Sequence, residues 1–370
     1  MSRNVQTLLQ QLVSYPSLSG EEFEIADYVE AWADRAGFPV GRVENNVYLS
    51  LGSGSTCLLL NSHLDIVPAS GDHPYDPFVP VVEDGRVYGR GTVDAKASCA
   101  AMLVAASNLA EEGWQPENGK LVVALTACEE TSRPRNGLQT LLPHLPELHG
   151  AVIGEPTGLE PCFSQKGLLI LEVTARGVSA HAARPDRGTN AIVKAAADVV
   201  ALESLTFDRI HAQLGPTTKA VTVIIGGSAR NMIPESCSFV IDLRTTPAYT
   251  HAEITETVKN LLESEVKVSS ERYVPTETHE SSVIAGAVRA ALPNAVPFGS
   301  PTVSDWAFLG NVPAVKLGPG DSRLSHTGRE SISVDELKAA VSLYESIVRR
   351  FFELSSSNNG VSAHAVEERR

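Results

Sequence analysis

A polar segment that follows an apolar run carries residues able to bind a metal ion. Asn61-Ser62-His63-Leu64-Asp65 comes directly after Cys57-Leu58-Leu59-Leu60, a run typical of a buried parallel strand. His63 and Asp65 would then lie at the carboxyl edge of a sheet, where ligand sites gather in open α/β folds. Because the two are separated by one residue, Asp65 could accept the second ring N–H of a metal-bound His63. Taken alone, such a pair is more often a capping or core feature.

Four further acids and one late histidine complete a candidate set. They are Asp94 in Gly89-Arg90-Gly91-Thr92-Val93-Asp94-Ala95-Lys96, Glu129 and Glu130 after a strand at 121–127, Glu155 in Gly154-Glu155-Pro156-Thr157, and His326 in Ser325-His326-Thr327. One bridging carboxylate, with one more carboxylate and one histidine per cation, is a common arrangement for two zinc ions roughly 3.5–4 Å apart. Each acid alone is typical of a solvated loop or an N-cap, but together they favour a two-metal hydrolase.

Charge balance supports two divalent cations. Two Zn²⁺ ions bring four positive charges, which Asp94, Glu130, Glu155 and one hydroxide would cancel. Glu129 is then not needed as a ligand and would act as a general base. A metal-bound water has a pKa of ~7, so it needs only modest help from a carboxylate. The same side chain would later protonate the leaving amine.

The motifs H-x-D, G-x-x-D-x-K, E-E, E-P-T and a late His, in this order, resemble those of the di-zinc aminoacylase and carboxypeptidase-type metallopeptidases. Within that family they look most like the acetylornithine deacetylase and succinyl-diaminopimelate desuccinylase branch, from residue 17 to about residue 352. The resemblance implies two divalent cations per subunit, zinc or alternatively cobalt. It implies that one cation is held by His63, Asp94 and Glu155 and the other by Asp94, Glu130 and His326. Asp65 would orient His63, and Glu129 would be the base.

The order of expected elements predicts two domains. A chain of 370 residues with 43% hydrophobic content exceeds the size at which domains usually split, about 250–300 residues. Strands are expected near 47–51, 57–61, 121–127 and 151–154, with helices over 21–35 and 95–112, which indicates an α/β fold with a helix-covered mixed sheet. Ser19-Gly20-Glu21-Glu22 has the pattern of a capping box for the first of these helices.

The middle of the chain has a different pattern. The expected order is a strand at 168–176, a helix at 190–204, strands at 220–226 and 238–243, a helix at 251–264 and a strand at 267–272, which is the ferredoxin-like β-α-β-β-α-β arrangement. Helices at 281–291 and 334–352 and a strand at 314–317 then resume the α/β character. We therefore expect residues 1–165 and 276–354 to form one catalytic domain, with 166–275 as an inserted lid or dimerisation domain. Residues 355–370 are polar and aperiodic, which favours a disordered tail.

The inserted domain contains its own candidate, His181 in Gly177-Val178-Ser179-Ala180-His181. On the residues alone, a histidine ahead of a helix start could equally be a solvated loop residue. The resemblance implies that His181 crosses a dimer interface and donates to the oxyanion in the partner's site, and therefore that the protein is a homodimer. The sheet edge of a small domain offers a dimerisation surface, because unpaired edges tend to be covered.

The substrate-binding candidates are Arg230, Asn231 and Arg244, which match places where the family binds the substrate's α-carboxylate and carbonyl oxygen. An arginine fork suits a carboxylate, although each arginine could instead form an ordinary surface ion pair. Gly318 and Gly320, in Gly318-Pro319-Gly320-Asp321, would present backbone N–H groups to a ligand. The alternative for these glycines is a tight turn before His326.

The Gly318 turn and the residues around His326 look more like the deacetylases of this branch than the desuccinylases. The expected activity is removal of a small acyl group from an N-acyl amino acid, with N-acetylornithine first, which would belong to arginine biosynthesis. The alternatives are N-acetyl-lysine or N-acetylcitrulline deacetylase, succinyl-diaminopimelate desuccinylase, and a dipeptidase or carboxypeptidase on the same scaffold. A non-catalytic metal-binding protein would be expected to have lost Glu129 or a ligand, and all are present.

The net charge indicates the class of partner, and the cysteines indicate the cellular compartment. A formal charge of −14 and a pI near 5.2 argue against nucleic acid and anionic membranes, which select clustered Lys and Arg. The five cysteines are odd in number and lack a C-x-x-C pair, so they are expected to be buried thiols in a reducing compartment. No signal peptide or uncharged run of about 18 residues is recognisable, so a cytoplasmic enzyme with a small-molecule substrate is expected.

Overall fold

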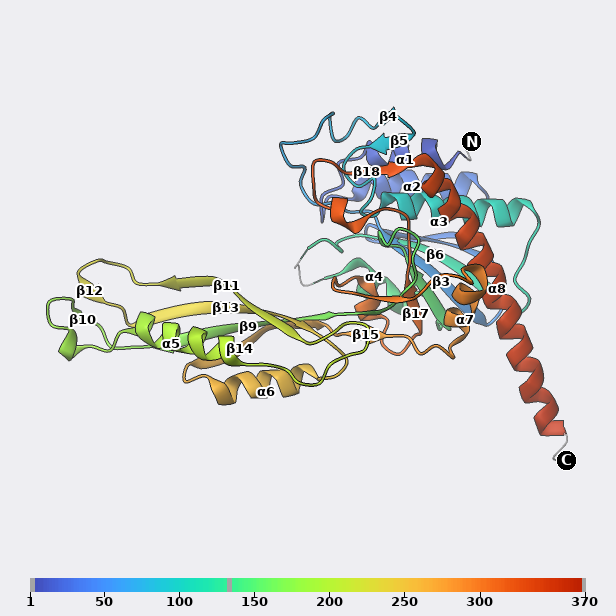
Figure 1. Ribbon diagram of the computed structural model, residues 1–370. Coiled ribbons are helices and arrows are strands. Elements are labelled where there is room, and N and C mark those ends of the chain that lie inside the picture. Colours follow the sequence, from blue (N-terminus) through green and yellow to red (C-terminus); the bar gives the residue numbers. More distant parts are fainter. Residues whose placement is uncertain (1–3, 132–134, 368–370) are drawn as a thin grey trace. The chain divides into compact units, whose positions relative to one another are not determined.

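The computed structural model describes residues 4–131 and 135–367, with the backbone alone for 358–367, and it contains two compact units (Figure 1). The first unit ends at Phe163 and resumes with Thr278–Phe298 and from Ser304 onward. The second unit is Ser164–Glu277 together with Gly299–Val303. The division falls close to the boundaries expected at 165 and 276. The segment 299–303 was expected in the first unit but belongs to the second. The carbonyl oxygen of Ser300 in this segment accepts the Lys166 N–H of the second unit at 2.9 Å.

The first unit is built on a mixed sheet, as predicted. Its strands run in the order β1 (Val40–Val43), β2 (Asn46–Gly52), β6 (Gly119–Thr126), β3 (Thr56–His63), β7 (Gly150–Ile153), β17 (Ala314–Lys316) and β8 (Cys162–Gln165). Strands β6, β3, β7 and β17 are parallel to one another, whereas β1, β2 and β8 pair antiparallel. Helices cover both faces, which explains why the parallel strands are apolar along nearly their whole length.

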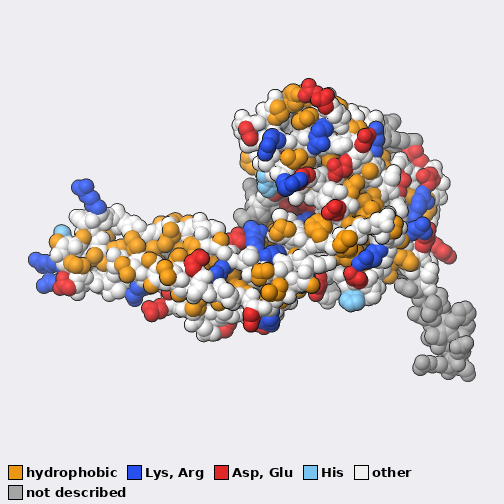
Figure 2. All heavy atoms as spheres, in the orientation of Figure 1, with side chains coloured by type: hydrophobic (Ala, Val, Ile, Leu, Met, Phe, Trp, Pro, Cys, Tyr) orange, Lys and Arg blue, Asp and Glu red, His pale blue; other side chains and the backbone are white. Residues whose placement is uncertain are grey.

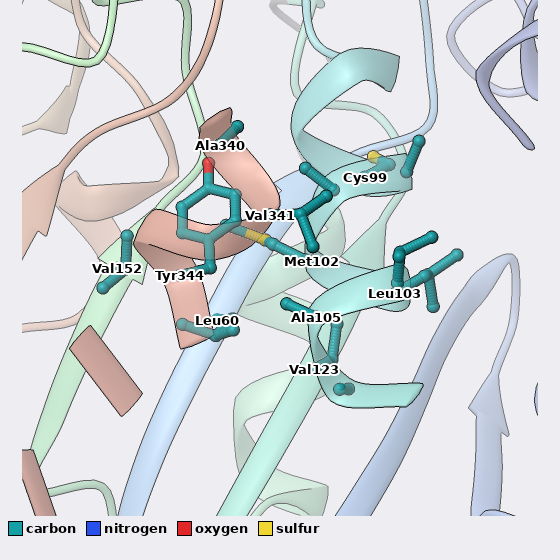
Figure 3. Packing of buried hydrophobic residues seen from close by; sticks show 14 of the residues in the cluster. Leu60, Cys99, Met102, Leu103, Ala105, Val123, Val152, Ala340, Val341 and Tyr344 are labelled. Carbon is teal, nitrogen blue, oxygen red and sulfur yellow. The ribbon is translucent and has the colours of Figure 1, made fainter. Parts of the chain in front are cut away.

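Alternate residues of β3 face two separate hydrophobic clusters. Leu58 and Leu60 belong to the larger cluster and Cys57 and Leu59 to the smaller one. The larger cluster is completed by α1 (Val5–Val13), α2 (Phe23–Arg35), α3 (Lys96–Glu111), α7 (Val283–Ala291) and α8 (Val334–Glu367), and the smaller one by α4 (Gly137–Leu141) and the 3₁₀ turn Asp305–Phe308. In Figure 3, Met102 of α3 and Tyr344 of α8 lie beside Leu60 of the sheet.

The second unit has the ferredoxin-like order predicted from the sequence. Its sheet runs β11 (Thr218–Gly226), β13 (Ser236–Thr245), β9 (Gly167–Arg176) and β14 (Glu265–Tyr273), and helices α5 (Ala191–Ser204) and α6 (His251–Leu261) pack on it. All three strand pairs are antiparallel. Alternate residues of β9, from Leu169 to Ala175, are buried against the helices. Two short strands, β10 (Ala180–His181) and β12 (Met232–Ile233), pair separately, and β15 (Thr276–Glu277) pairs with Gln165 and Ser164.

Several short elements were not anticipated. These are the three-stranded sheet of β4 (Val81–Glu83), β5 (Arg86–Tyr88) and β18 (Ser331–Ser333), strand β16 (Phe298–Ser300), and the 3₁₀ turns Leu142–His144, Pro185–Arg187 and Ser322–Leu324. Each spans three residues, too few for a hydrophobic period to be visible in the sequence.

Two local expectations were wrong. The capping box does not form, because α2 begins at Phe23 and no side chain caps its Glu22 terminus. The tail expected to be disordered from Ser355 continues α8 as helix to Glu367, and residues 368–370 lie outside the described residues. The stretch contains no proline, and a single glycine, Gly360, costs only about 1 kcal/mol in a helix interior.

The described part of the chain includes all five cysteines, and no disulfide joins them. Four of the thiols are buried and Cys128 is half-buried, in agreement with the prediction from their number and spacing. Within the described residues, no helix combines the length and apolarity that crossing a membrane requires.

Candidate metal centre

The candidate ligands lie at the carboxyl ends of three neighbouring parallel strands. His63 is the last residue of β3, Glu130 follows the end of β6, and Glu155 follows the end of β7. Asp94 lies in the turn that leads into α3, and His326 lies between the 3₁₀ turn at 322–324 and β18. Since parallel neighbours end at the same edge of a sheet, the strand order brings His63, Glu130 and Glu155 to one rim.

Asp94 occupies the middle of the group. Its Oδ1 lies 3.3 Å from Nε2 of His63, and its Oδ2 lies 3.4 Å from Nε2 of His326. The carboxylate therefore presents one oxygen to each imidazole. This geometry suits a ligand shared by two cations, the role that the family resemblance implied for this residue.

The remaining acids lie on either side of Asp94. Oε1 of Glu130 lies 2.8 Å from Nε2 of His326, and Oε1 of Glu155 lies 4.0 Å from Nε2 of His63. One ligand atom each from His63, Asp94 and Glu130 fall within 4.8 Å of one another. Imidazole nitrogens and carboxylate oxygens are ligands that Zn²⁺ takes, so this donor set fits a divalent transition metal.

Asp65 connects the histidine to the segment that carries the two glutamates. Its Oδ1 accepts the Glu129 N–H at 3.0 Å, and its Oδ2 accepts the Glu130 N–H at 2.9 Å. Nδ1 of His63 lies 3.0 Å from the Asp65 carbonyl oxygen and 3.6 Å from the carboxylate, so the backbone oxygen is the nearer acceptor. The sequence predicted the carboxylate in this position. Either oxygen fixes the ring so that Nε2 faces Asp94.

The pKa values of the cation-free group follow from its burial and its charges. Burial lowers the pKa of His63, but Asp65, Asp94 and the charges of Glu129 and Glu155 more than offset this and raise it well above its ordinary value. Hydrogen bonds that His326 donates to the carboxylates of Asp94 and Glu130 raise its pKa to about 10, although burial opposes them. Without cations, therefore, protons bound to the histidines balance the carboxylates.

Two of the acids have pKa values that burial raises above the ordinary value for glutamate. Burial raises the pKa of Glu155 to about 8, against the opposing charges of Lys316 and His63. Burial and the neighbouring charge of Glu155 also raise the pKa of Glu129 well above its ordinary value. A carboxyl group whose pKa is shifted toward 7 can accept and return a proton at physiological pH, which is what a general base requires.

The predicted residues of the second unit form a group of their own. His181 in β10 pairs with Met232, and the Asn231 carbonyl oxygen accepts the Ala182 N–H at 2.9 Å, so His181, Arg230 and Asn231 belong to one exposed region. Arg244 is placed differently. Its Nε lies 2.8 Å from Oδ1 of Asp242 on the same strand, which is the ion pair that the sequence left open as the alternative.

Gly318 and Gly320 do not present free N–H groups. The Gly318 N–H donates to Oγ1 of Thr157 at 3.2 Å, and the Gly320 N–H donates to Oε1 of Glu336 at 2.7 Å. This corrects the predicted role in substrate binding and favours the alternative of a structural turn. A side chain at Gly318 would approach the Glu155 carbonyl oxygen to 2.6 Å, so glycine allows the turn to pack against the Glu155 segment.

Sequence reasoning missed three buried charged residues around the site. Asp305 accepts from Thr126 Oγ1 at 2.9 Å and from Asn136 Nδ2 at 2.7 Å, and burial raises its pKa to about 6. Glu330 forms a buried ion pair with Arg90 at 2.7 Å. Only Arg90 lies inside a recognised motif, and an acid outside any motif gives no sequence signal for burial.

The chain is similar in sequence to proteins of known family. Residues 59–350 match the model of peptidase family M20/M25/M40. The acetylornithine deacetylase of Myxococcus xanthus is 33% identical over 346 residues, covering 85% of this chain and 88% of the relative. The succinyl-diaminopimelate desuccinylase of Parvibaculum lavamentivorans is 26% identical over 376 residues, covering 92% and 94%.

Solved structures share the fold. A tripeptidase from Staphylococcus aureus superposes with a TM-score of 0.77 at 22% identity, covering 95% of this chain and 98% of that chain. A dinuclear metal-binding M20 peptidase from Bacillus subtilis superposes with a TM-score of 0.75 at 14% identity, with the same coverage. The chain belongs to the M20/M25/M40 peptidase family, and it is a metal-dependent amide hydrolase.

Proposed function

We propose that the protein removes the acetyl group from N-acetylornithine. The observation that carries the reaction class is Asp94, with one oxygen toward each of two histidines at the rim of the parallel strands. The substrate is supported by the 33% identity to an acetylornithine deacetylase, which exceeds the 26% identity to the desuccinylase.

Each predicted ligand has a task in this proposal. His63, Asp94 and Glu155 would hold one cation, and Asp94, Glu130 and His326 the other, with zinc as the proposed metal and cobalt as the alternative. Two cations bound there would polarise the amide carbonyl and lower the pKa of water. Glu129 accepts a proton from the water that attacks the carbonyl carbon. It returns that proton to the amine nitrogen as the C–N bond breaks.

We further propose that the protein acts as a homodimer in which His181 serves the partner's site by donating to the carbonyl oxygen. The second unit supports this because β11 is an edge strand, and Val223, Ile224 and Ile225 on it are 47%, 55% and 68% exposed. Figure 2 shows hydrophobic side chains along the visible face of this unit. Exposed apolar edge strands are usually covered by another chain. The reduced cysteines fit the cytoplasmic location that we propose.

A substrate panel tests the proposed activity. The zinc- or cobalt-loaded protein is assayed with N-acetylornithine, N-acetyl-lysine, N-acetylcitrulline, succinyl-diaminopimelate and a dipeptide. We expect N-acetylornithine to give the highest kcat/KM. Because a site that binds a charged group rejects analogues lacking that group, kcat/KM for such analogues should be lower by several orders of magnitude. Preference for the lysine or citrulline compound would contradict the ornithine assignment.

A desuccinylase or a peptidase is the second candidate. Desuccinylase relatives match more than nine-tenths of the chain, and a tripeptidase shares the fold. If the succinyl compound or the dipeptide exceeds N-acetylornithine by more than tenfold in the same panel, the deacetylase proposal is wrong and the second candidate takes its place.

A further inference from the structure

The residues that look like a capping box lie in another network. Ser19 and Glu22 would cap the start of α2 if they acted locally, but neither does. Ser19 Oγ donates to Oδ2 of Asp65 at 2.6 Å, across 46 residues of sequence. Glu22 is fully buried, and its Oε1 accepts the Cys128 N–H at 3.1 Å, across 106 residues. Glu22 thus contacts the segment 127–130 directly, and Ser19 contacts Asp65, whose oxygens accept the N–H groups of Glu129 and Glu130 in that segment.

All four backbone N–H groups of segment 127–130 donate to buried side chains. Oδ1 of Asn46 accepts from Ala127 at 2.9 Å, Glu22 accepts from Cys128, and the two oxygens of Asp65 accept from Glu129 and Glu130. The segment has no regular secondary structure, and Cys128 has a positive φ of 57°, which non-glycine residues rarely adopt. Side chains, and not a helix or strand, therefore define its conformation.

Glu22 is itself held in place by further donors. Its Oε1 also accepts the Gly20 N–H at 2.6 Å, and its Oε2 accepts from Nδ2 of Asn45 at 3.1 Å. A buried carboxylate is stable only when its oxygens are hydrogen-bonded, and this one has partners on both. Where a local rule such as a capping box fails, the side chains are commonly engaged in a functional site.

We infer that Ser19 and Glu22 are positioning residues for the reaction, which fix the 127–130 segment and so aim Glu129 at the substrate water and Glu130 at its cation. The inference rests on the proposed function for the role of Glu129. Glu22 contacts the backbone of Cys128 and Ser19 contacts Asp65, so both act through other residues. Outer hydrogen-bond partners of metal ligands typically change metal affinity by 10–100-fold. A displacement of about 1 Å at a reacting group can cost about 10²-fold in rate.

The test compares four variants: Glu22→Ala, Glu22→Gln, Ser19→Ala and, as the matched control, Glu21→Ala, whose side chain is exposed. Zinc affinity of the cation-free protein is measured by competition with a chromophoric chelator, and amide hydrogen exchange is followed across residues 121–131. We expect Glu22→Ala and Ser19→Ala to bind zinc at least tenfold more weakly and to lose protection in this segment. Glu22→Gln keeps an acceptor oxygen and should stay close to wild type, as should Glu21→Ala.

Steady-state kinetics separate positioning from general stability. In zinc-saturated Glu22→Ala, kcat should fall about 10²-fold while KM stays within about twofold, because substrate binding does not use this segment. If a folded Glu22→Ala protein keeps wild-type zinc affinity, amide hydrogen exchange and kcat, the inference is wrong. It is also wrong if Glu22→Gln loses as much zinc affinity and activity as Glu22→Ala. If Glu22→Ala does not fold, wild-type behaviour of Ser19→Ala overturns it instead.

The two proposals fail in different ways. A wild-type protein that binds zinc but hydrolyses no compound of the panel would overturn the proposed function. The zinc affinity and hydrogen exchange of the variants would still decide whether Ser19 and Glu22 position the segment.

Discussion

Glu129 and Glu130 are adjacent in sequence but have different surroundings. Glu130 contacts His326 at 2.8 Å and so belongs to the ligand group. Burial and the neighbouring carboxylates, Glu155 first, raise the pKa of Glu129. We expect Glu130 to hold a cation and Glu129 to transfer the proton, the roles that charge balance and the family resemblance predicted for them.

Glu129→Gln should leave two cations bound per subunit while kcat falls by ~10²–10⁴-fold, because the variant loses only the group that accepts the proton. Metal content by mass spectrometry and steady-state kinetics check this. Glu130→Gln is the matched comparison, since it should lose metal as well as rate. If Glu129→Gln also loses metal, Glu129 is a ligand and the two roles are wrongly assigned.

The stability of the cation-free protein should fall as pH rises. The folded-state pKa of His326, about 10, lies above its ordinary value of 6.5, and that of Glu155, about 8, lies above 4.5. Between each pair of values the folded protein holds a proton that the unfolded chain has released, so stability is full below the lower value and is lost as pH rises through the higher one. The window runs from about pH 4.5 to 10.

Thermal unfolding in a chelator across this pH range tests the prediction. Tm should fall with rising pH, and added zinc should flatten the slope, because cations take the place of the bound protons. A Tm that rises with pH in the chelator would contradict the ionisation states described for these residues.

At the scale of elements, the turn that carries Asp94 is tied to the segment that follows His326. Oε1 of Glu330 accepts the N–H groups of Val93 at 2.9 Å and Asp94 at 3.1 Å, while its Oε2 pairs with Arg90 at 2.7 Å. Both members of the ion pair are almost fully buried. Two segments that carry candidate ligands are thus held together by one carboxylate.

Glu330→Gln should destabilise the cation-free protein by about 3–5 kcal/mol, because it leaves the Arg90 charge buried and uncompensated. Urea unfolding of the cation-free protein measures this. Glu280→Gln is the control, since Glu280 pairs with Arg289 at a similar 2.6 Å but both are well exposed, and such pairs contribute only about 0–1 kcal/mol. Equal effects of the two substitutions would show that the Glu330 pair is not buried in solution.

The elements that could be predicted are those whose buried positions follow a local sequence pattern. Strand β3 was recognisable because it is apolar on both faces, and β9 because its burial alternates. The capping box failed because tertiary contacts of Ser19 and Glu22 outweigh a local preference, which no local pattern reveals. Likewise, the candidate ligands were proposed from motif order, whereas Glu330 and Asp305 make their contacts with residues distant in sequence, which no motif indicates.

At the scale of the whole molecule, the discontinuous first unit explains why His326 can belong to the site. The ferredoxin-like unit separates His326 from His63 in sequence, yet both side chains face Asp94 within the first unit. The order of apolar runs predicted this return of the chain. The tail could not be predicted in the same way, because weak helix propensity in residues 355–367 gives no periodic signal.

Subunit mixing tests the proposed homodimer. If His181 acts in the partner's site, mixtures of His181→Ala and Glu129→Gln subunits should recover activity, because one site in each mixed dimer then has an intact base and a donated histidine. The two parent variants should each remain impaired. Verified exchange of subunits without any recovery would contradict a role for His181 across the interface.

A crystal structure of the zinc-loaded protein, with anomalous diffraction measured at the zinc edge, would show whether Asp94 is shared between two cations. We expect two anomalous peaks roughly 3.5–4 Å apart, one beside His63 and Glu155 and the other beside Glu130 and His326, with one oxygen of Asp94 on each. A single peak, or two peaks without Asp94 between them, would contradict the shared role of Asp94.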